Sequence, residues 1–232
     1  MRDLHSHILP GIDDGSNTIE ESKKILEKAY AVGFVEMCLT PHYYKKYDYI
    51  ADNKTKEKLL EELKNKNIDL SYGNEVFIDS DILNNIKQGK VSTINGGKYI
   101  LIEFPFDIYY SLIEDYIEEI LSANLIPIIA HPERYEYYQY DVNRINYFKE
   151  KGVLFQSSYG SFVGYYGKKV NKTVKKMLKE NLIDIFSLDQ HTDMYVLENF
   201  SKVKKKILKY ISEEKFKIMS DTLIKEIINT KK

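Results

Sequence analysis

The chain has 232 residues, of which 43% are hydrophobic and 30% charged, and its 34 Lys and Arg against 35 Asp and Glu give a formal net charge of −1. This length allows one large domain with a substantial core, and without a Gly/Ser-rich linker or a break in composition a single domain is expected over residues 1–232. The near-neutral charge excludes a nucleic-acid binder that works through a basic face.

The single cysteine, Cys38, excludes both a disulfide framework and a Cys-rich zinc site. It lies in a strand-like run, residues 35–39, where we expect a small buried apolar residue rather than a reactive thiol. No apolar run approaches the roughly 20 residues that span a membrane, and His5 and His7 stand where a secretory signal would lie. The chain is therefore expected to be cytoplasmic, without direct membrane insertion.

The first half of the chain alternates strand and helix patterns. After an opening strand at residues 4–8, Asn17 or Thr18 can cap a helix that Gly33 ends. The pattern then predicts strands at 34–40, 68–76 and 99–103, helices at 52–66 and 80–90, and a turn at 95–97.

The second half repeats the alternation. Helices are predicted at 112–123, 141–151 and 163–181, and strands at 126–130, 153–156 and 183–188. Two basic helical stretches, near 197–211 and 213–228, close the chain, and the lysine-rich run at 202–206 is expected to be a solvated helix face.

Strands therefore alternate with helices six or seven times, which predicts an α/β fold with buried parallel strands. The spacing alone fits both a barrel and an open doubly wound sheet. No glycine-rich phosphate loop follows the first strand, which disfavours a nucleotide-binding Rossmann fold.

All five histidines lie at or just after strand-like runs, and four carboxylates occupy equivalent places. A lone histidine is more often a hydrogen-bonded core residue than a ligand, but the joint pattern favours a metal site, because the carboxyl ends of parallel strands converge. Side chains at i and i+2 of a strand share a face, which applies to His5 with His7 and to Asp189 with His191. The candidate ligands are His5, His7, Asp14, His42, Glu75, Glu103, His131, Asp189 and His191.

Nine candidates exceed the four ligands of a usual zinc site, so two or three divalent ions bridged by carboxylates are expected. Imidazole and carboxylate ligands without thiolate suit manganese, iron or zinc, and the residues alone do not choose among them. Clustered metals fit phosphoester hydrolysis, since they bind phosphate oxygens and lower the pKa of water.

Arg134, three residues after His131, can hold phosphate oxygens in two-point contact, and the alternative is a surface ion pair with Glu133. With His42 and His191 it makes up the predicted catalytic set. Asp13 is expected only to shape its turn. Residues 156–161 either line the pocket or form a plain loop.

These motifs resemble those of the PHP (polymerase and histidinol phosphatase) superfamily. The resemblance is closer to the bacterial manganese-dependent tyrosine phosphatases of capsule and exopolysaccharide operons. The matching stretches span most of the chain, and they are residues 5–15, 40–42, 73–75, 101–103, 127–135 and 189–191. The long opening motif and the His-Pro-Glu-Arg-Tyr motif at 131–135 are specific, whereas a bare His-x-His would not be.

The resemblance implies a distorted seven-stranded β/α barrel with a trinuclear centre at its carboxyl end, most often loaded with manganese. It also implies a phosphotyrosine protein as substrate, namely the tyrosine-rich tail of a membrane-associated kinase that controls polysaccharide export. Arg134 matches a phosphate-binding arginine. The implied ligand groups are His5, His7, Glu75 and Asp189 for one ion, Glu75, Glu103 and His131 for the second, and Asp14, His42 and His191 for the third.

The chain departs from the family pattern after His191, where a second arginine is usual and residues 187–198 contain none. Metal binding should survive, because Asp189 and His191 remain. Two alternatives stay open: a phosphatase of small esters such as histidinol phosphate, and a weakly active scaffold that binds the kinase. The oligomeric state is also open.

Overall fold

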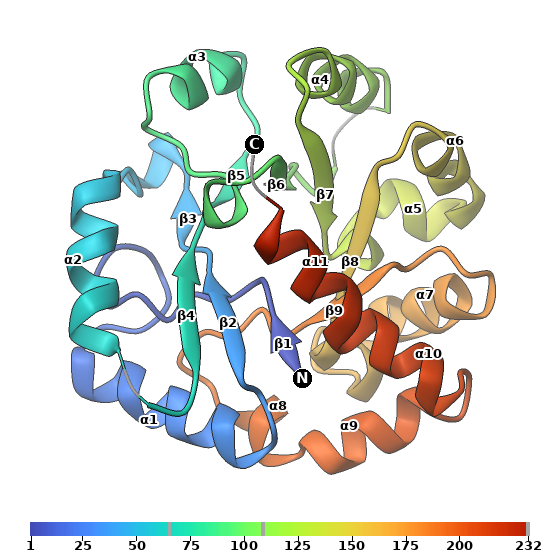
Figure 1. Cartoon of the computed structure of the whole chain (residues 1–232). Coiled ribbons are helices and arrows are strands. Elements are labelled where there is room, and N and C mark those ends of the chain that lie inside the picture. The colour runs from blue at the N-terminus through green and yellow to red at the C-terminus, as the bar shows by residue number, and fades with distance from the viewer. Residues whose placement is uncertain (65, 108–109, 231–232) are drawn as a thin grey trace.

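A computed structural model describes residues 1–64, 66–107 and 110–230. Its strands surround a common interior, with helices packed around them (Figure 1). The strands are β1 (Arg2–Asp3), β2 (Glu36–Leu39), β3 (His42–Tyr43), β4 (Asp69–Tyr72), β5 (Glu75–Phe77), β6 (Tyr99–Glu103), β7 (Ile126–Ala130), β8 (Leu154–Ser158) and β9 (Ile185–Ser187). They form one sheet in the order β1-β2-β4 and another in the order β3-β5-β6-β7-β8-β9, with parallel pairing throughout.

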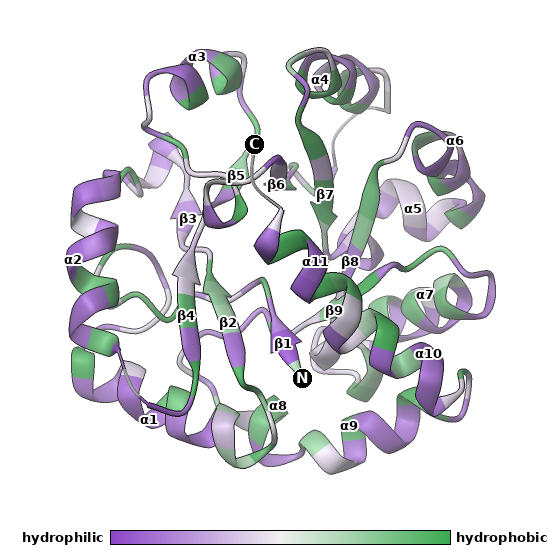
Figure 2. Ribbon diagram, in the orientation of Figure 1, coloured by the Kyte–Doolittle hydropathy of each residue, from purple (hydrophilic) through white to green (hydrophobic). Residues whose placement is uncertain are grey.

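Helices lie between most of the successive strands and after the last one. They are α1 (Ile19–Ala31), α2 (Asn53–Leu63), α3 (Ile82–Lys87), α4 (Tyr110–Ser122), α5 (Glu136–Tyr140), α6 (Ile145–Glu150), α7 (Lys168–Lys179), α8 (Tyr195–Glu198), α9 (Phe200–Ile207), α10 (Glu213–Lys217) and α11 (Leu223–Asn229). Thr18 caps α1 through the backbone N–H of Glu21, as predicted. The outer helices carry both hydrophilic and hydrophobic residues (Figure 2), as expected of amphipathic helices that bury one face.

The predicted single-domain α/β fold with parallel strands is confirmed, and the strands at 99–103 and 126–130 are found with the expected bounds. The prediction of an opening strand at residues 4–8 is wrong. The ladder with β2 contains only Arg2 and Asp3, and beyond it Ser6 makes a single bridging pair with Gln190. The carbonyl of His5 and the amide of His7 pair with the backbone of Asp189 and Gln190 instead.

Other predicted elements differ in their extent. The strand at 68–76 is two strands, β4 and β5, interrupted at Gly73 and Asn74. The helix predicted at 163–181 starts at Lys168. Two elements, β3 and α5, were not predicted. The helix at 52–66 ends at Leu63, and its Asn65, like residues 231–232, lies outside the described residues.

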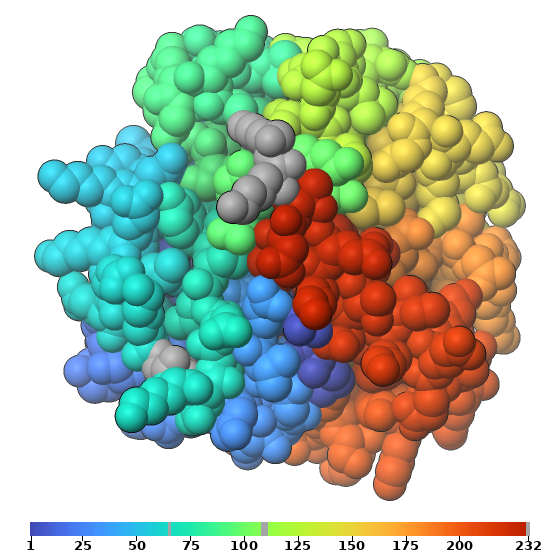
Figure 3. Space-filling model, in the orientation of Figure 1, coloured from blue at the N-terminus to red at the C-terminus, as the bar shows by residue number. Residues whose placement is uncertain are grey.

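The amino end of the strand interior is filled by α11. Leu101, Ile128 and Ile185, which point inward, pack against Ile224 and Ile227 of this helix. The C-terminal segment lies across the middle of this face in the space-filling view (Figure 3). The interior is thus apolar and closed at one end, and only the carboxyl end of the strands is left to form a pocket.

No described helix is both long and apolar enough to cross a bilayer. The buried position of Cys38 is confirmed, and burial raises the pKa of its thiol to about 12. The thiol therefore stays protonated and takes no part in nucleophilic chemistry.

Candidate metal centre

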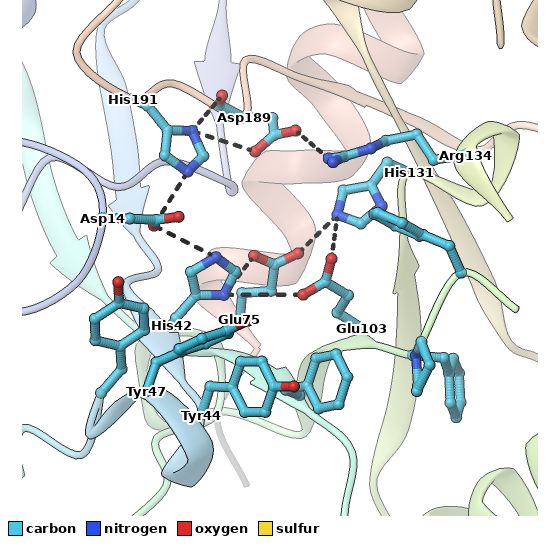
Figure 4. A pocket seen from close by; sticks show the side chains of 15 residues that line it. Asp14, His42, Tyr44, Tyr47, Glu75, Glu103, His131, Arg134, Asp189 and His191 are labelled. Atoms are coloured by element: carbon cyan, nitrogen blue, oxygen red, sulfur yellow. Dashed lines mark hydrogen bonds and ion pairs between the residues drawn. The ribbon is translucent and has the colours of Figure 1, made fainter. Parts of the chain in front are cut away.

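The carboxyl ends of the strands bring the nine predicted ligands together: seven of them line one pocket (Figure 4), and the buried His5 and His7 contact Glu75 of that pocket. Strand alternation explains part of this arrangement: Leu101 faces the apolar interior, so Glu103, two residues on, faces the same interior at its other end. His131 instead follows β7 with a left-handed backbone (φ 33°), a conformation that is costly for a non-glycine residue. That turn allows its side chain to leave the strand pattern and meet Glu75.

The first predicted ligand group is fully buried. His5 Nε2 and His7 Nε2 lie 3.1 Å apart, and both approach Glu75 Oε2, at 3.2 and 3.3 Å. Asp189 Oδ1 lies 3.5 Å from His5 Nε2 and 3.7 Å from His7 Nε2. Two imidazole nitrogens that face each other beside two carboxylates form a ready set of metal donors.

The second group shares Glu75. Its other oxygen, Oε1, lies 3.0 Å from His131 Nε2, and Glu103 Oε1 lies 3.5 Å from the same nitrogen. Glu75 is therefore central, since each of its two oxygens faces a different part of the cluster.

The third group is the most open to solvent. Asp14 Oδ1 lies 3.4 Å from His191 Nε2 and 3.6 Å from His42 Nε2, and the Asp14 side chain is 53% exposed. Gly15 allows this approach, because a Cβ there would lie 1.9 Å from the carbonyl oxygen of His7. Any ion held here would exchange more easily than one among the buried ligands.

The donor atoms also group in a way that the family resemblance does not imply. Within the described residues, sets of donors that lie within 4.8 Å of one another are His7, Asp14, His42 and His191; His5, His7 and Glu75; and His42, Glu75 and Glu103. His7 and His42 thus lie between neighbouring groups, and the division of ligands among ions stays a prediction.

Outer hydrogen bonds orient the two opening histidines. Gln156 Oε1 lies 2.7 Å from His5 Nδ1, and Asp13 Oδ2 lies 2.7 Å from His7 Nδ1. Each contact fixes a proton on Nδ1 and leaves Nε2 free for a metal. Asp13 also accepts the backbone N–H of His42 at 2.9 Å, so it does more than shape its turn. Gln156 is likewise part of the site rather than of a plain loop.

A buried polar network supports the segment that carries Glu75. Lys56 Nζ donates to Asn74 Oδ1 at 2.6 Å and to Ser92 Oγ at 2.8 Å. Asn74 Nδ2 in turn donates to the carbonyl of Pro41, next to His42. Lys56 is fully buried, and burial lowers its pKa to about 8. Sequence reasoning missed this lysine because it lies on a helix rich in charged residues.

Arg134 lies at the edge of the pocket between two aromatic rings. Its guanidinium is 4.6 Å from the centre of the Phe106 ring and 4.8 Å from that of Tyr166, and it reaches Asp189 Oδ2 at 3.4 Å. Tyr166 also donates to Asp189 Oδ2 at 3.0 Å. The alternative surface pair with Glu133 is wrong, because the buried Glu133 carboxylate accepts from Ser157, Ser158 and Ser161 instead.

Burial and the neighbouring charges shift the pKa values of the ligands in opposite directions. Burial disfavours the charged form of His5, but the charges of Glu75 and Asp189 outweigh it and raise its pKa to about 9. Burial and the charge of Glu75 raise the pKa of Glu103 to about 8. Burial and the charge of Arg134 lower the pKa of His131 to about 4. Without a metal, therefore, protons are shared among closely packed acids and imidazoles.

The donor set fits divalent metal ions. His42 Nδ1 is buried without a hydrogen-bond partner, 3.1 Å from Glu75 Oε2. A cation would supply the partner that this nitrogen lacks, and the Nε2 atoms of His5 and His7, which face each other at 3.1 Å, are two further donors for a metal. The oxygen and nitrogen donors, with no thiolate among them, suit hard or borderline ions.

The segment after His191, which lacks an arginine, carries Asp193. This carboxylate accepts from the hydroxyl of Tyr165 at 2.7 Å, and the Tyr165 ring stacks on that of Tyr195. Among the described residues that line the pocket, Arg134 is the only arginine or lysine.

Comparisons with known proteins give a family match and named relatives. A family model described as capsular polysaccharide synthesis, CpsB/CapC, matches residues 1–228. The chain is 32% identical over 198 residues to the putative tyrosine-protein phosphatase CapC of Staphylococcus aureus, covering 83% of this chain and 77% of that relative.

Two solved structures share the fold. One belongs to the structures of YwqE from Bacillus subtilis and CpsB from Streptococcus pneumoniae, which are described as metal-dependent tyrosine phosphatases. The matched structure superposes with a TM-score of 0.84 at 24% identity, and the match covers 100% of this chain and 96% of the other. A histidinol phosphate phosphatase from Lactococcus lactis gives a TM-score of 0.51 at 14% identity, covering 89% and 94% of the two chains. The chain belongs to the CpsB/CapC family of capsular polysaccharide synthesis proteins.

Proposed function

We propose that this chain is a metal-dependent phosphomonoesterase that hydrolyses phosphotyrosine in proteins. The observation that carries the proposal is the convergence of four carboxylates and five imidazoles. The carboxylates and three imidazoles line one pocket of about 530 Å³ with a single arginine at its edge, and His5 and His7 approach Glu75 of that pocket at 3.2 and 3.3 Å. The named relative CapC is a putative tyrosine-protein phosphatase, which favours this function over hydrolysis of a small ester or a scaffold role.

Two or three divalent ions fit the nine donors, and manganese is the ion we propose. His5, His7, Glu75 and Asp189 would hold the most buried ion. Glu75, Glu103 and His131 would hold a second, and Asp14, His42 and His191 the most exposed one. When bound, such ions supply Lewis-acid chemistry: they neutralise phosphate charge and lower the pKa of water.

Arg134 would bind the non-bridging oxygens of the phosphate. The rings of Phe106 and Tyr166 restrict its guanidinium, and Asp189 Oδ2 aligns it from the side. A restrained guanidinium loses little freedom when it makes two parallel hydrogen bonds to a phosphate. His42 and His191 lie where they can contact both an ion and the substrate. The departing phenolate has an ordinary pKa of about 10, so the reaction does not require a dedicated general acid.

The two sheets also support the seven-stranded barrel as a proposal. The amide of His7 donates to the carbonyl of Gln190 at 2.8 Å, and the amide of Asp189 donates to the carbonyl of His5 at 2.9 Å. These bonds connect the chain after β1 to the chain after β9. With β2 continued by β3 and β4 by β5, the nine strands would occupy seven barrel positions.

We further propose a cytoplasmic location and a membrane-associated tyrosine kinase as the source of the phosphotyrosine. Capsular polysaccharide synthesis, the process in the family description, motivates this partner.

The test is hydrolysis of a phosphotyrosyl peptide by metal-free protein supplemented with manganese, compared with histidinol phosphate and with His5→Ala. Phosphate release from the peptide that depends on added metal and is lost in His5→Ala supports the function. Faster release from histidinol phosphate, or binding of a phosphorylated kinase tail without any turnover, would overturn it.

A further inference from the structure

A group of aromatic side chains lines the same pocket as the metal ligands. The group consists of Tyr44, Tyr47, Phe77 and Phe106, and we call it the aromatic rim. In Figure 4, Tyr44 and Tyr47 lie on the side of the pocket opposite Asp189 and His191. Tyr47 is 57% exposed and Phe106 38% exposed. Exposed rings clustered at one pocket mark a binding surface.

Strand register places two of these rings directly beyond two ligands. His42 of β3 pairs with Glu75 of β5, and Tyr43 pairs with Val76. Tyr44 and Phe77 follow one residue later, and their rings stack with centroids 3.9 Å apart and planes at 9°. Since i and i+2 share a strand face, this stacked pair lies on the ligand-bearing side, about 6.6 Å further along the strands.

The segment that carries Tyr44 and Tyr47 is held in place before any ligand arrives. Tyr44 and Tyr49 exchange two backbone hydrogen bonds, of 2.9 and 3.2 Å. Lys45 Nζ between them pairs with Asp79 at 2.9 Å, beyond the end of β5. The Tyr47 ring meets the Tyr44 ring edge to face at 4.8 Å. Rings fixed in this way lose little freedom on binding, so their contact energy appears as affinity.

We propose that the aromatic rim is the subsite for the ring of an aryl phosphate, with the ring lying against Tyr44 and Phe77 while the phosphate meets Arg134 and the metal ligands. Because the aromatic pair lies further along the strands than the ligand pair, a phenyl ring esterified directly to a phosphate at the ligands extends toward it. An alkyl ester places no ring at that distance. The inference rests on the proposed function for its substrate, phosphotyrosine, and supplies the basis of its specificity.

The test is calorimetric binding of phenylphosphonate and methylphosphonate, which cannot be hydrolysed, to manganese-supplemented protein. Wild type is expected to bind phenylphosphonate about tenfold more tightly, the factor that two aromatic contacts supply. In the double variant Tyr44→Leu, Phe77→Leu the preference should fall to less than twofold, with methylphosphonate binding unchanged. Tyr140→Leu is the matched control, because it removes an aromatic side chain that is 86% exposed and does not line the pocket. This variant should keep the full preference for phenylphosphonate.

A preference that persists in the double variant, equal weakening of both phosphonates, or no preference in wild type would overturn the subsite. Parallel assays on a phosphotyrosyl peptide separate this outcome from failure of the proposed function. If wild type hydrolyses the peptide but the double variant keeps the phenyl preference, only the subsite is refuted. If the double variant loses the phenyl preference but wild type does not hydrolyse the peptide, only the proposed function is refuted. A thermal melt of each variant confirms that it is folded.

Discussion

The two ends of the strand interior hold opposite kinds of side chain. At the amino end, Leu101 and Ile128 pack against Ile227 of α11 in a buried apolar cluster. At the carboxyl end, Glu103 and His131, which follow them along the same two strands, meet Glu75 in a cluster of charges. Stability and chemistry are thus separated along the length of each strand, as parallel β/α folds allow.

The difference has an energetic basis. Apolar burial at the α11 end contributes about 25 cal/mol per Å² removed from water. Buried carboxylates such as Glu75 are costly unless a positive charge compensates them. Imidazolium groups supply that charge in the metal-free chain, as the raised pKa of His5 indicates. Metal ions would supply it in the active protein. Substitutions at the two ends should therefore have separable effects.

The largest effect is expected from Glu75→Gln, which removes the charge between the ligand groups. We expect kcat/KM on a phosphotyrosyl peptide to fall about 1,000-fold, because transition-state stabilisation by metals is worth several kcal/mol. Circular dichroism should still show a cooperative folded state. Retention of more than a tenth of wild-type activity would show that the centre does not depend on Glu75.

The converse substitution is Ile227→Ala, at the apolar end. Truncating a fully buried isoleucine costs about 3 kcal/mol, which lowers the melting temperature by roughly 6–12 °C in a chain of this size. At 25 °C kcat should stay within twofold of wild type. If activity falls while the melting temperature is unchanged, the two ends are not separable.

A smaller effect is expected from Asp13→Asn, which alters the orienting partner of His7 without removing a ligand. Outer partners of metal-bound histidines contribute about 10–100-fold to metal affinity. A manganese titration should show a loss in this range. Asp115→Asn, an exposed substitution on α4, is the control that should leave the affinity unchanged; equal affinities for the two variants would contradict the orienting role.

The smallest change is the pH dependence of metal binding. Manganese must displace the protons of His5, whose pKa is raised to about 9, and of Glu103, whose pKa is raised to about 8. Both groups gain protons as the pH falls through these values, so protons compete with the metal more strongly at lower pH. Manganese affinity should fall about sixfold between pH 8 and pH 7.5, because the protonated fractions of both groups rise over this interval. An affinity that is constant over this interval would mean that these groups are not ligands.

Strand periodicity predicted much of this arrangement. The runs at 99–103 and 126–130 are short and apolar, so their ends, and with them Glu103 and His131, could be placed correctly. The opening segment was harder. His5 and His7 follow the ladder that ends at Asp3, and their backbone pairs with residues 189–190 from the far end of the chain, which no local pattern indicates.

The parts that sequence did not reveal depend on contacts between distant residues. Gln156 approaches His5 from across the fold, and no local pattern marks it as a partner. From the sequence alone, Lys56 is expected to be a solvated lysine on a charged helix, but in the structure it is buried and bonded to Asn74. The stacked pair of Tyr44 and Phe77 follows from the register of β3 with β5, and β3 is too short to produce a periodic signal.

The central claim is that the carboxyl end of the strands is a metal centre that hydrolyses phosphotyrosine. Its most direct test is a calorimetric titration of metal-free protein with manganese, followed by a phosphotyrosyl peptide assay on the same samples. Binding of two or three manganese ions per chain, with activity that appears only as these sites fill, is the predicted result. Full hydrolysis by protein that holds no metal, or saturation with manganese without any phosphate release, would contradict the claim.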